Sequence, residues 1–268
     1  MTELNIDLHP AQLEIFNSTK RFKVVAAGRR FGKSRLAAWI LLINAIQSTE
    51  KDVFYIGPTF QQSKDIMWLM LKELGADLIA AAHENTAVLT LINGRRIYLK
   101  GSDRPDSLRG VGLAYVVLDE YASMKPVVWE QIIRPTLADV RGGAMFIGTP
   151  AGKNHFYDLY TDALGDDDWD AWQFNSTDNP FIPDDEIEAA RKTMSSMSFR
   201  QEFEASFETF SGGIFKEEWF KTEPEPEEGN YVIAIDPAGF EAIEKERNLK
   251  RSRLDETAIA IVKVDRDR

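Results

Sequence analysis

The segment GRRFGKS at 28–34 has the residue types of a phosphate-binding loop. In such a loop, backbone N–H groups and a helix N-terminus face the anion, the lysine reaches the β- and γ-phosphates, and the following hydroxyl ligates Mg²⁺. Here these side chains are Lys33 and Ser34. The full pattern has a glycine at position 27, where this chain has Ala27 followed by Gly28. The match therefore depends on a strand before the loop and a helix after it.

Two adjacent acids could bind Mg²⁺ and orient the water that attacks the nucleotide. The run YVVLDE at 115–120 ends in Asp119 and Glu120. A nucleotide site needs a carboxylate in the Mg²⁺ shell and a group that orients the attacking water, and we assign these roles to Asp119 and Glu120. Burial of two adjacent acids is costly unless a cation or hydrogen bonds compensate, so their position after an apolar run favours a site. The alternatives are solvated acids at a strand end and, for Lys33, a solvated lysine after a glycine turn.

Short apolar runs that end in glycine, proline or the acidic pair predict buried parallel strands covered by helices on both faces. These runs span residues 22–28, 53–58, 114–120 and 144–150. Apolar residues at helical spacing predict helices over 34–48 and 61–74. Asn93-Gly94, between the runs 87–92 and 95–101, predicts a β-hairpin. The fold class is therefore α/β, with a mostly parallel sheet flanked by helices.

The chain changes character after residue 178. Residues 183–207 predict helix, and EPEPEEGN at 223–230 is typical of a linker, since it has two prolines and no apolar residue. Apolar runs that start at 231 and 257 predict two further strands. We therefore divide the chain into an α/β core at 1–178, a helical lid at 179–222, a linker at 223–230 and the start of another domain at 231–268.

The composition of the chain excludes several classes of protein. The chain has 268 residues, no cysteine and a net charge of −11, so disulfides, thiolate zinc sites and cysteine nucleophiles are excluded. The polar, acidic start lacks the features of a secretory signal, and the apolar stretch 36–46 is shorter than the ~20 residues that span a bilayer, so we expect a soluble protein. Residues 158–228 hold 5 basic and 20 acidic residues, whereas residues 1–100 hold 13 and 9. The negative total therefore does not exclude contact with nucleic acid.

The order of motifs resembles the large terminase subunit of tailed bacteriophages, the ATPase and nuclease that packages DNA into a procapsid. The motifs are HPAQ, GRRFGKS, the SLRG that precedes YVVLDE, IGTP and IDPAG, and they cover nearly the whole chain. Ala27 is a usual variation in that family. Herpesvirus terminases have the same order of motifs, and helicases have only some of these motifs. The resemblance implies a P-loop NTPase core of the ASCE/RecA-like type, a helical lid and the start of an RNase H-like nuclease domain.

The resemblance also implies roles for individual residues. Gln12 reads the adenine of ATP; the alternative is an exposed glutamine in a first helix. Arg109 is an arginine finger for a neighbouring subunit, or else it pairs with Asp103 or Asp106. Thr149 couples hydrolysis to movement, or else it belongs to a plain strand-end turn. The loop residues assigned to the nucleotide are Gly28, Arg29, Arg30, Phe31, Gly32, Lys33, Ser34 and Arg35, with Arg29 sensing the γ-phosphate and acting with Lys33, Arg109 and Glu120 in catalysis.

A second metal site is implied for the nuclease. Asp236 and Asp255 correspond to acids that bind Mg²⁺ or Mn²⁺ in an RNase H-like domain, and the alternative for both is a simple strand-end acid. Because the sequence stops at Arg268, before the family's remaining acids, we expect that this chain does not cleave DNA by itself. We also expect residues 229–268 to be poorly packed or to fold only with further sequence.

The resemblance predicts a motor that hydrolyses ATP with Mg²⁺ and translocates double-stranded DNA. Its expected partners are the portal protein, the small terminase subunit and further copies of itself in a ring, with no membrane. Its expected location is the cytoplasm of the infected bacterial host, and it is absent from the mature virion. Two alternatives remain: a helicase-like, nucleic-acid-dependent ATPase, which needs a second RecA-like domain, and an inactive prophage-derived fragment that binds nucleotide.

Overall fold

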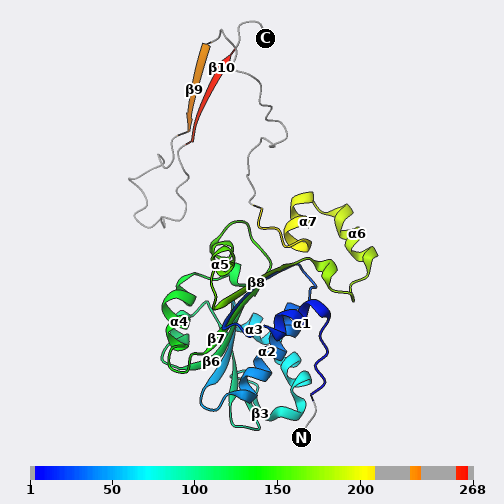
Figure 1. Ribbon diagram of the computed structural model, residues 1–268, viewed down its shortest axis with the longest axis vertical. Helices are drawn as coiled ribbons and strands as arrows, with labels where there is room; N and C mark the ends of the chain where they lie inside the picture. Colours follow the sequence, from blue (N-terminus) through cyan, green and yellow to red (C-terminus); the bar gives the residue numbers. More distant parts are fainter. Residues whose placement is uncertain (1–3, 209–229, 237–257, 265–268) are drawn as a thin grey trace. The chain divides into compact units, whose positions relative to one another are not determined.

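The computed structural model describes residues 4–208, 230–236 and 258–264 (Figure 1). The chain divides into two compact units, Met1–Ser211 and Gly212–Arg268. Among the residues just named, no helix has the length and apolar character needed to cross a membrane. The finer division of the chain into core, lid and linker stays a prediction.

An eight-stranded sheet forms the centre of the first unit, in the order β3-β4-β5-β2-β6-β7-β1-β8. The pairs β3-β4 and β4-β5 are antiparallel, and all other neighbours are parallel. The predicted mostly parallel sheet is therefore confirmed. The strands are β1 (Phe22–Ala27), β2 (Asp52–Gly57), β3 (Ile79–His83), β4 (Val88–Leu91), β5 (Arg96–Gly101), β6 (Leu113–Asp119), β7 (Gly143–Gly148) and β8 (Trp169–Phe174).

Helices cover both faces of this sheet (Figure 1). One apolar core packs α2 and α3 against one face, and a second core packs α5 and the π-helical segment η4 against the other. All six residues of β1 are buried, as expected for a strand covered on both sides. The α-helices are α1 (Pro10–Asn17), α2 (Lys33–Gln47), α3 (Phe60–Leu74), α4 (Arg134–Thr136), α5 (His155–Ala163), α6 (Asp184–Thr193) and α7 (Ser196–Phe203). The shorter helical segments are η1 (Ala76–Leu78), η2 (Pro105–Leu108), η3 (Tyr121–Ser123), η4 (Val128–Ile133) and η5 (Ser176–Asp178).

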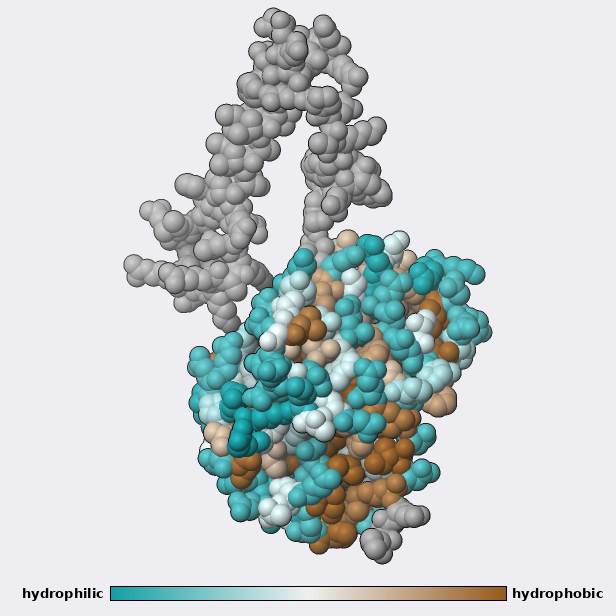
Figure 2. All heavy atoms as spheres, in the orientation of Figure 1, coloured by the Kyte–Doolittle hydropathy of each residue, from teal (hydrophilic) through white to brown (hydrophobic). Residues whose placement is uncertain are grey.

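The predicted hairpin is confirmed by the antiparallel pair β4-β5, whose turn places Gly94 at φ 80°. The single helix expected over 183–207 is instead two helices, α6 and α7. The break follows Thr193 because the Ser195 side chain accepts a hydrogen bond from the Ser198 N–H and so starts a new helix. In Figure 2 the outer surface of α6 is hydrophilic, in line with its three acids in the first turn.

The second unit contains two described strands, β9 (Asn230–Asp236) and β10 (Ala258–Val264), which pair antiparallel with Asp236 opposite Ala258. Both strands were predicted from the sequence. Asp236 is the last residue of β9, whereas Asp255 lies outside the described residues. The nuclease role of these two acids therefore stays a prediction.

Candidate nucleotide site

Residues 28–32 of the predicted phosphate loop lie between β1 and α2, and Lys33 and Ser34 begin α2. β1 is the strand between β7 and β8, and the Gly28 N–H continues the pairing to the Phe174 carbonyl at 3.0 Å. Gly32 has φ 98°, in the left-handed region that favours glycine, and it precedes α2 without a side-chain cap. The first N–H groups of α2 therefore have no capping side chain, as expected of an anion-binding helix N-terminus.

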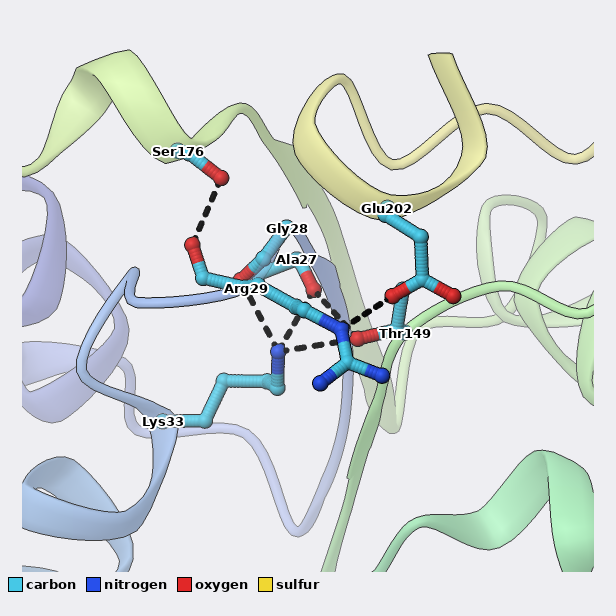
Figure 3. Close-up of polar contacts among 7 residues, drawn as sticks. All are labelled: Ala27, Gly28, Arg29, Lys33, Thr149, Ser176 and Glu202. Atoms are coloured by element: carbon cyan, nitrogen blue, oxygen red, sulfur yellow. Dashed lines mark hydrogen bonds and ion pairs between the residues drawn. The ribbon is translucent and has the colours of Figure 1, made fainter. Parts of the chain in front are cut away.

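The ammonium group of Lys33 is turned toward the loop itself. Its Nζ donates to the Ala27 carbonyl at 2.7 Å, the Gly28 carbonyl at 2.9 Å and Thr149 Oγ1 at 3.2 Å (Figure 3). Burial lowers the pKa of Lys33, while the nearby charges of Glu120 and Asp119 oppose that shift. The end of β7 is thus in direct contact with the lysine of the phosphate loop.

The two acids lie at the end of β6 with different surroundings. Asp119 is buried; its Oδ2 accepts a hydrogen bond from the Tyr55 hydroxyl, and its Oδ1 accepts the Glu120 N–H at 2.8 Å. Burial raises the pKa of Asp119, and the bond from Tyr55 acts in the opposite direction. Tyr55, in β2, carries no sequence motif and was not among the predicted site residues.

Glu120 has an unusual backbone. Its φ of 54° and ψ of 44° place it in the left-handed region, which costs a non-glycine residue roughly 1–3 kcal/mol and occurs preferentially at functional sites. Burial and the neighbouring charge of Asp119 raise the pKa of Glu120. A carboxylate with a raised pKa is better matched to general-base chemistry near neutral pH than an ordinary glutamate.

Residues after β8 cover the phosphate loop from above in Figure 3. Arg29 forms an ion pair with Glu202 of α7, and its backbone N–H donates to the Glu202 carbonyl at 2.7 Å. The hydrogen bond and charge of Glu202 raise the pKa of Arg29. Ser176 Oγ donates to the Arg29 carbonyl at 2.6 Å, and Asn179 Nδ2 donates to the Arg30 carbonyl at 2.7 Å. None of these three partners was identified from the sequence.

A cavity of 1220 Å³ lies between the phosphate loop, the ends of β6 and β7, and the helices α6 and α7. The structure brings together around it most of the predicted site residues, namely Arg29, Arg30, Gly32, Lys33, Ser34, Arg35, Glu120 and Thr149. Phe31 does not line this cavity. It is fully buried, and its ring packs on those of His9 and Phe174.

Gln12 lies beside the phosphate loop and is 2% exposed, so the alternative of an exposed glutamine is wrong. Its Nε2 donates to the Gly32 carbonyl at 2.8 Å and its Oε1 accepts the His9 N–H at 3.1 Å. Gln12 lines a second cavity of 290 Å³ together with Arg35 and Phe181. The side chain of Phe181 is an aromatic group that the sequence reasoning missed, and it lines both cavities.

Arg109 does not line the nucleotide cavity. It follows η2, and its Nε lies 3.2 Å from Asp106 Oδ1, in the pairing that the sequence left open as an alternative. Its side chain is 52% exposed, so it is accessible from outside the subunit. Within the described part of the chain, no group of three or more His, Cys, Asp and Glu side chains is arranged to hold a metal ion.

Comparison with known proteins identifies the family and the fold of the chain. The family "Terminase large subunit, T4likevirus-type, N-terminal" matches residues 24–222. The large terminase subunit of Escherichia phage T5 is 31% identical over 218 residues, which are 76% of this chain and 49% of that protein. The chain spans about half the length of the curated relatives it matches.

Solved structures show the same fold. The large terminase ATPase domain of Thermus phage P74-26 matches with a TM-score of 0.65 and 25% identity, over 75% of this chain and 94% of that domain. The large terminase of another thermophilic bacteriophage, in complex with ADP, matches with a TM-score of 0.67 and 18% identity, over 86% of this chain and 62% of that protein. The predicted fold class is confirmed, and the chain belongs to the family of terminase large subunits.

Proposed function

We propose that this chain hydrolyses ATP as the motor part of a phage terminase. The observation that carries the proposal is the convergence of Lys33, Glu120 and Arg29 around one cavity that α6 and α7 cover. Family membership supports it, as do the solved complexes of the second thermophilic phage's terminase with ADP and ATP-γ-S.

The residues present fit a magnesium–nucleotide complex. Ser34 and Asp119 offer the hard oxygen ligands that Mg²⁺ prefers, and the carboxylate of Asp119 is buried and already oriented by two hydrogen bonds. When bound, Mg²⁺ would neutralise charge on the β- and γ-phosphates. Lys33 would exchange its bonds to the Ala27 and Gly28 carbonyls for bonds to phosphate oxygens.

In this proposal the other site residues act on the attacking water, on the γ-phosphate and on the lid. Glu120 orients the attacking water and accepts its proton, consistent with the raised pKa of this carboxylate. Arg29 leaves Glu202 to stabilise charge on the γ-phosphate, and the lid of α6 and α7 moves with it. Thr149, which contacts Lys33, couples a change at the Lys33 ammonium group to the end of β7. Gln12, which binds the Gly32 carbonyl, positions the phosphate loop next to the adenine base.

The partners of this motor are double-stranded DNA, the portal protein, the small terminase subunit and further copies of the chain in a ring in the cytoplasm of the infected host. Arg109 is exposed and outside its own cavity, which supports a role in a neighbouring subunit's site. Turnover per chain should therefore rise with protein concentration, and Arg109→Ala should abolish that rise. Turnover that is independent of concentration and unaffected by Arg109→Ala would contradict the role.

The proposed function is tested with the 268-residue chain by ATPase turnover and ATP binding. Glu120→Gln should bind ATP but lose about 10²- to 10⁴-fold in turnover, since it removes the general base. Lys33→Ala should fail to bind ATP. Glu84→Gln, an exposed acid outside the cavity, is the matched control and should behave as the parent chain. Full turnover by Glu120→Gln would overturn the assignment, and absence of turnover in the parent chain would favour an inactive nucleotide-binding fragment.

A further inference from the structure

The turn that follows Glu120 is held from outside by the start of α5. His155 Nε2 lies 3.0 Å from the Tyr121 carbonyl, and because a carbonyl only accepts, this nitrogen carries the proton. Asn154 Nδ2 donates to the Ala122 carbonyl at 3.2 Å. Two neighbouring side chains thus bind two successive carbonyls immediately after the left-handed Glu120.

Packing reinforces these hydrogen bonds. Tyr121 is 3% exposed, and its ring meets the His155 ring edge-on, with centroids 4.9 Å apart. The Tyr121 carbonyl also accepts the Met124 N–H at 3.0 Å, so it has two donors. A Cβ added at Gly148 would lie 3.4 Å from the Tyr121 nitrogen, so β7 passes directly beside the turn. The β7–α5 segment therefore holds the turn that immediately follows the left-handed Glu120.

The same segment reaches both halves of the nucleotide site. At its start, Thr149 Oγ1 lies 3.2 Å from Lys33 Nζ, and at its end Asn154 and His155 bind the turn after Glu120. We propose that Asn154 and His155 are positioning residues that hold the Glu120 carboxylate at a fixed place relative to Lys33. This inference rests on the proposed catalytic role of Glu120.

The two functions of Asn154 can be separated by mutation. Its Oδ1 accepts the Phe156 N–H at 3.0 Å and so caps α5, while its Nδ2 holds Ala122. Asn154→Asp keeps the cap acceptor and removes the donor. Asn154→Ser also keeps a cap acceptor and removes the Nδ2 amide without adding charge, and its hydroxyl is on a side chain too short to take the place of Nδ2 at the Ala122 carbonyl. Serine and aspartate both cap helices well. For His155, Phe keeps the ring packed on Tyr121 without the N–H, whereas Gln keeps an N–H donor without the ring.

The test measures ATPase kcat and KM, ADP affinity, melting temperature and hydrogen exchange of residues 118–124 in the 268-residue chain. Asn154→Asp, Asn154→Ser and His155→Phe should lower kcat by about 10- to 100-fold, the range expected for a small misplacement of a catalytic group. KM, ADP affinity and melting temperature should stay close to those of the parent, and exchange in 118–124 should be faster. His155→Gln should retain most of the turnover, and Thr161→Ala, on α5 away from the turn, should retain all of it.

Each outcome decides one point. Unchanged kcat in Asn154→Asp and Asn154→Ser, with an active parent chain, would overturn the positioning role and leave the proposed function intact. A loss of kcat that follows a loss of ADP affinity or melting temperature would also overturn it, because that pattern indicates a purely structural contact. If the parent chain has no turnover, the proposed function itself fails, and the positioning role fails with it.

Discussion

Replacement of Tyr55 by phenylalanine removes the hydroxyl group that donates a hydrogen bond to Asp119. The Tyr55 hydroxyl donates to Asp119 Oδ2, and both residues are buried, with exposures of 0% and 4%. Phenylalanine keeps the ring and its packing. We therefore expect the fold to persist and the effect to fall on Asp119, the residue proposed to hold Mg²⁺.

The size of the effect follows from the burial of this pair. A hydrogen bond to a charged group contributes about 1.5–3 kcal/mol, and burial prevents water from replacing the lost donor. Since about 1.4 kcal/mol corresponds to a factor of ten, Tyr55→Phe should weaken Mg²⁺ binding by about 10- to 100-fold. Loss of a side chain that orients a metal ligand typically has an effect of the same size.

The effect of Tyr55→Phe on Mg²⁺ binding should depend on pH, because it changes the pKa of Asp119. The bond from Tyr55 lowers the pKa of Asp119 against the rise caused by burial, so its loss raises that pKa further. The deficit of Tyr55→Phe should therefore be greatest at low pH and shrink as pH rises. The assay is ATPase turnover against free Mg²⁺ at several pH values, with Tyr98→Phe as control because Tyr98 packs on Phe54 in the other core. An unchanged Mg²⁺ requirement, or a deficit that grows with pH, would refute the reasoning.

Single substitutions at Glu202, Phe181 and Lys23 should change nucleotide binding or stability in defined directions. Glu202→Gln should tighten ATP binding by about two- to fivefold, because the Arg29 side chain is 69% exposed and an ion pair open to water on one side contributes only about 0.2–1 kcal/mol. Weaker binding would count against competition between Glu202 and phosphate. Phe181→Ala should weaken ATP binding by about fivefold or more and leave tripolyphosphate binding unchanged. Phe181 is 75% exposed and lines the cavity, and stacking of a base on an aromatic ring contributes about 1–3 kcal/mol. Equal losses for both ligands would contradict a contact between Phe181 and the base. Burial lowers the pKa of Lys23 from its ordinary 10.5 to about 8. Between these two pH values Lys23 is protonated in the unfolded chain and neutral in the folded one, so the free energy of unfolding should rise with pH from about 8 to 10.5. Lys23→Met should remove that rise in urea unfolding series, and an identical pH profile for both proteins would show that Lys23 is not its source.

The part of the site that lies at strand ends could be predicted from the sequence. Glu120 and Thr149 directly follow apolar strands, and Lys33 comes after the loop that follows β1. The carboxyl ends of neighbouring parallel strands meet at one edge of a sheet. Local order along the chain therefore places these residues at the same edge of the sheet. The hairpin was equally accessible, since Asn93-Gly94 specifies its turn without help from the rest of the fold.

The residues that hold these groups in place could not be predicted in the same way. Tyr55 is 64 residues from Asp119, and Glu202 is 173 residues from Arg29, and neither lies in a recognisable pattern. Their positions depend on strand order and on how α7 packs, which are properties of the whole sheet. β8 was missed for a related reason: its six residues are all half-buried or exposed, and its sequence WDAWQF mixes an acid with aromatic residues, so no continuous apolar run marks it.

The hydrogen bonds that cover the phosphate loop also determine when the loop can take its shape during synthesis. Gly28, Arg29 and Arg30 bind partners in the range 174–202, whereas their own segment leaves the ribosome about 150 residues earlier. A nascent chain that has reached α5 already has β1 and β7 but lacks β8 and α7, so the loop's backbone groups must bind water until those elements arrive. We therefore expect nucleotide binding to begin only after β8 and α7 have folded.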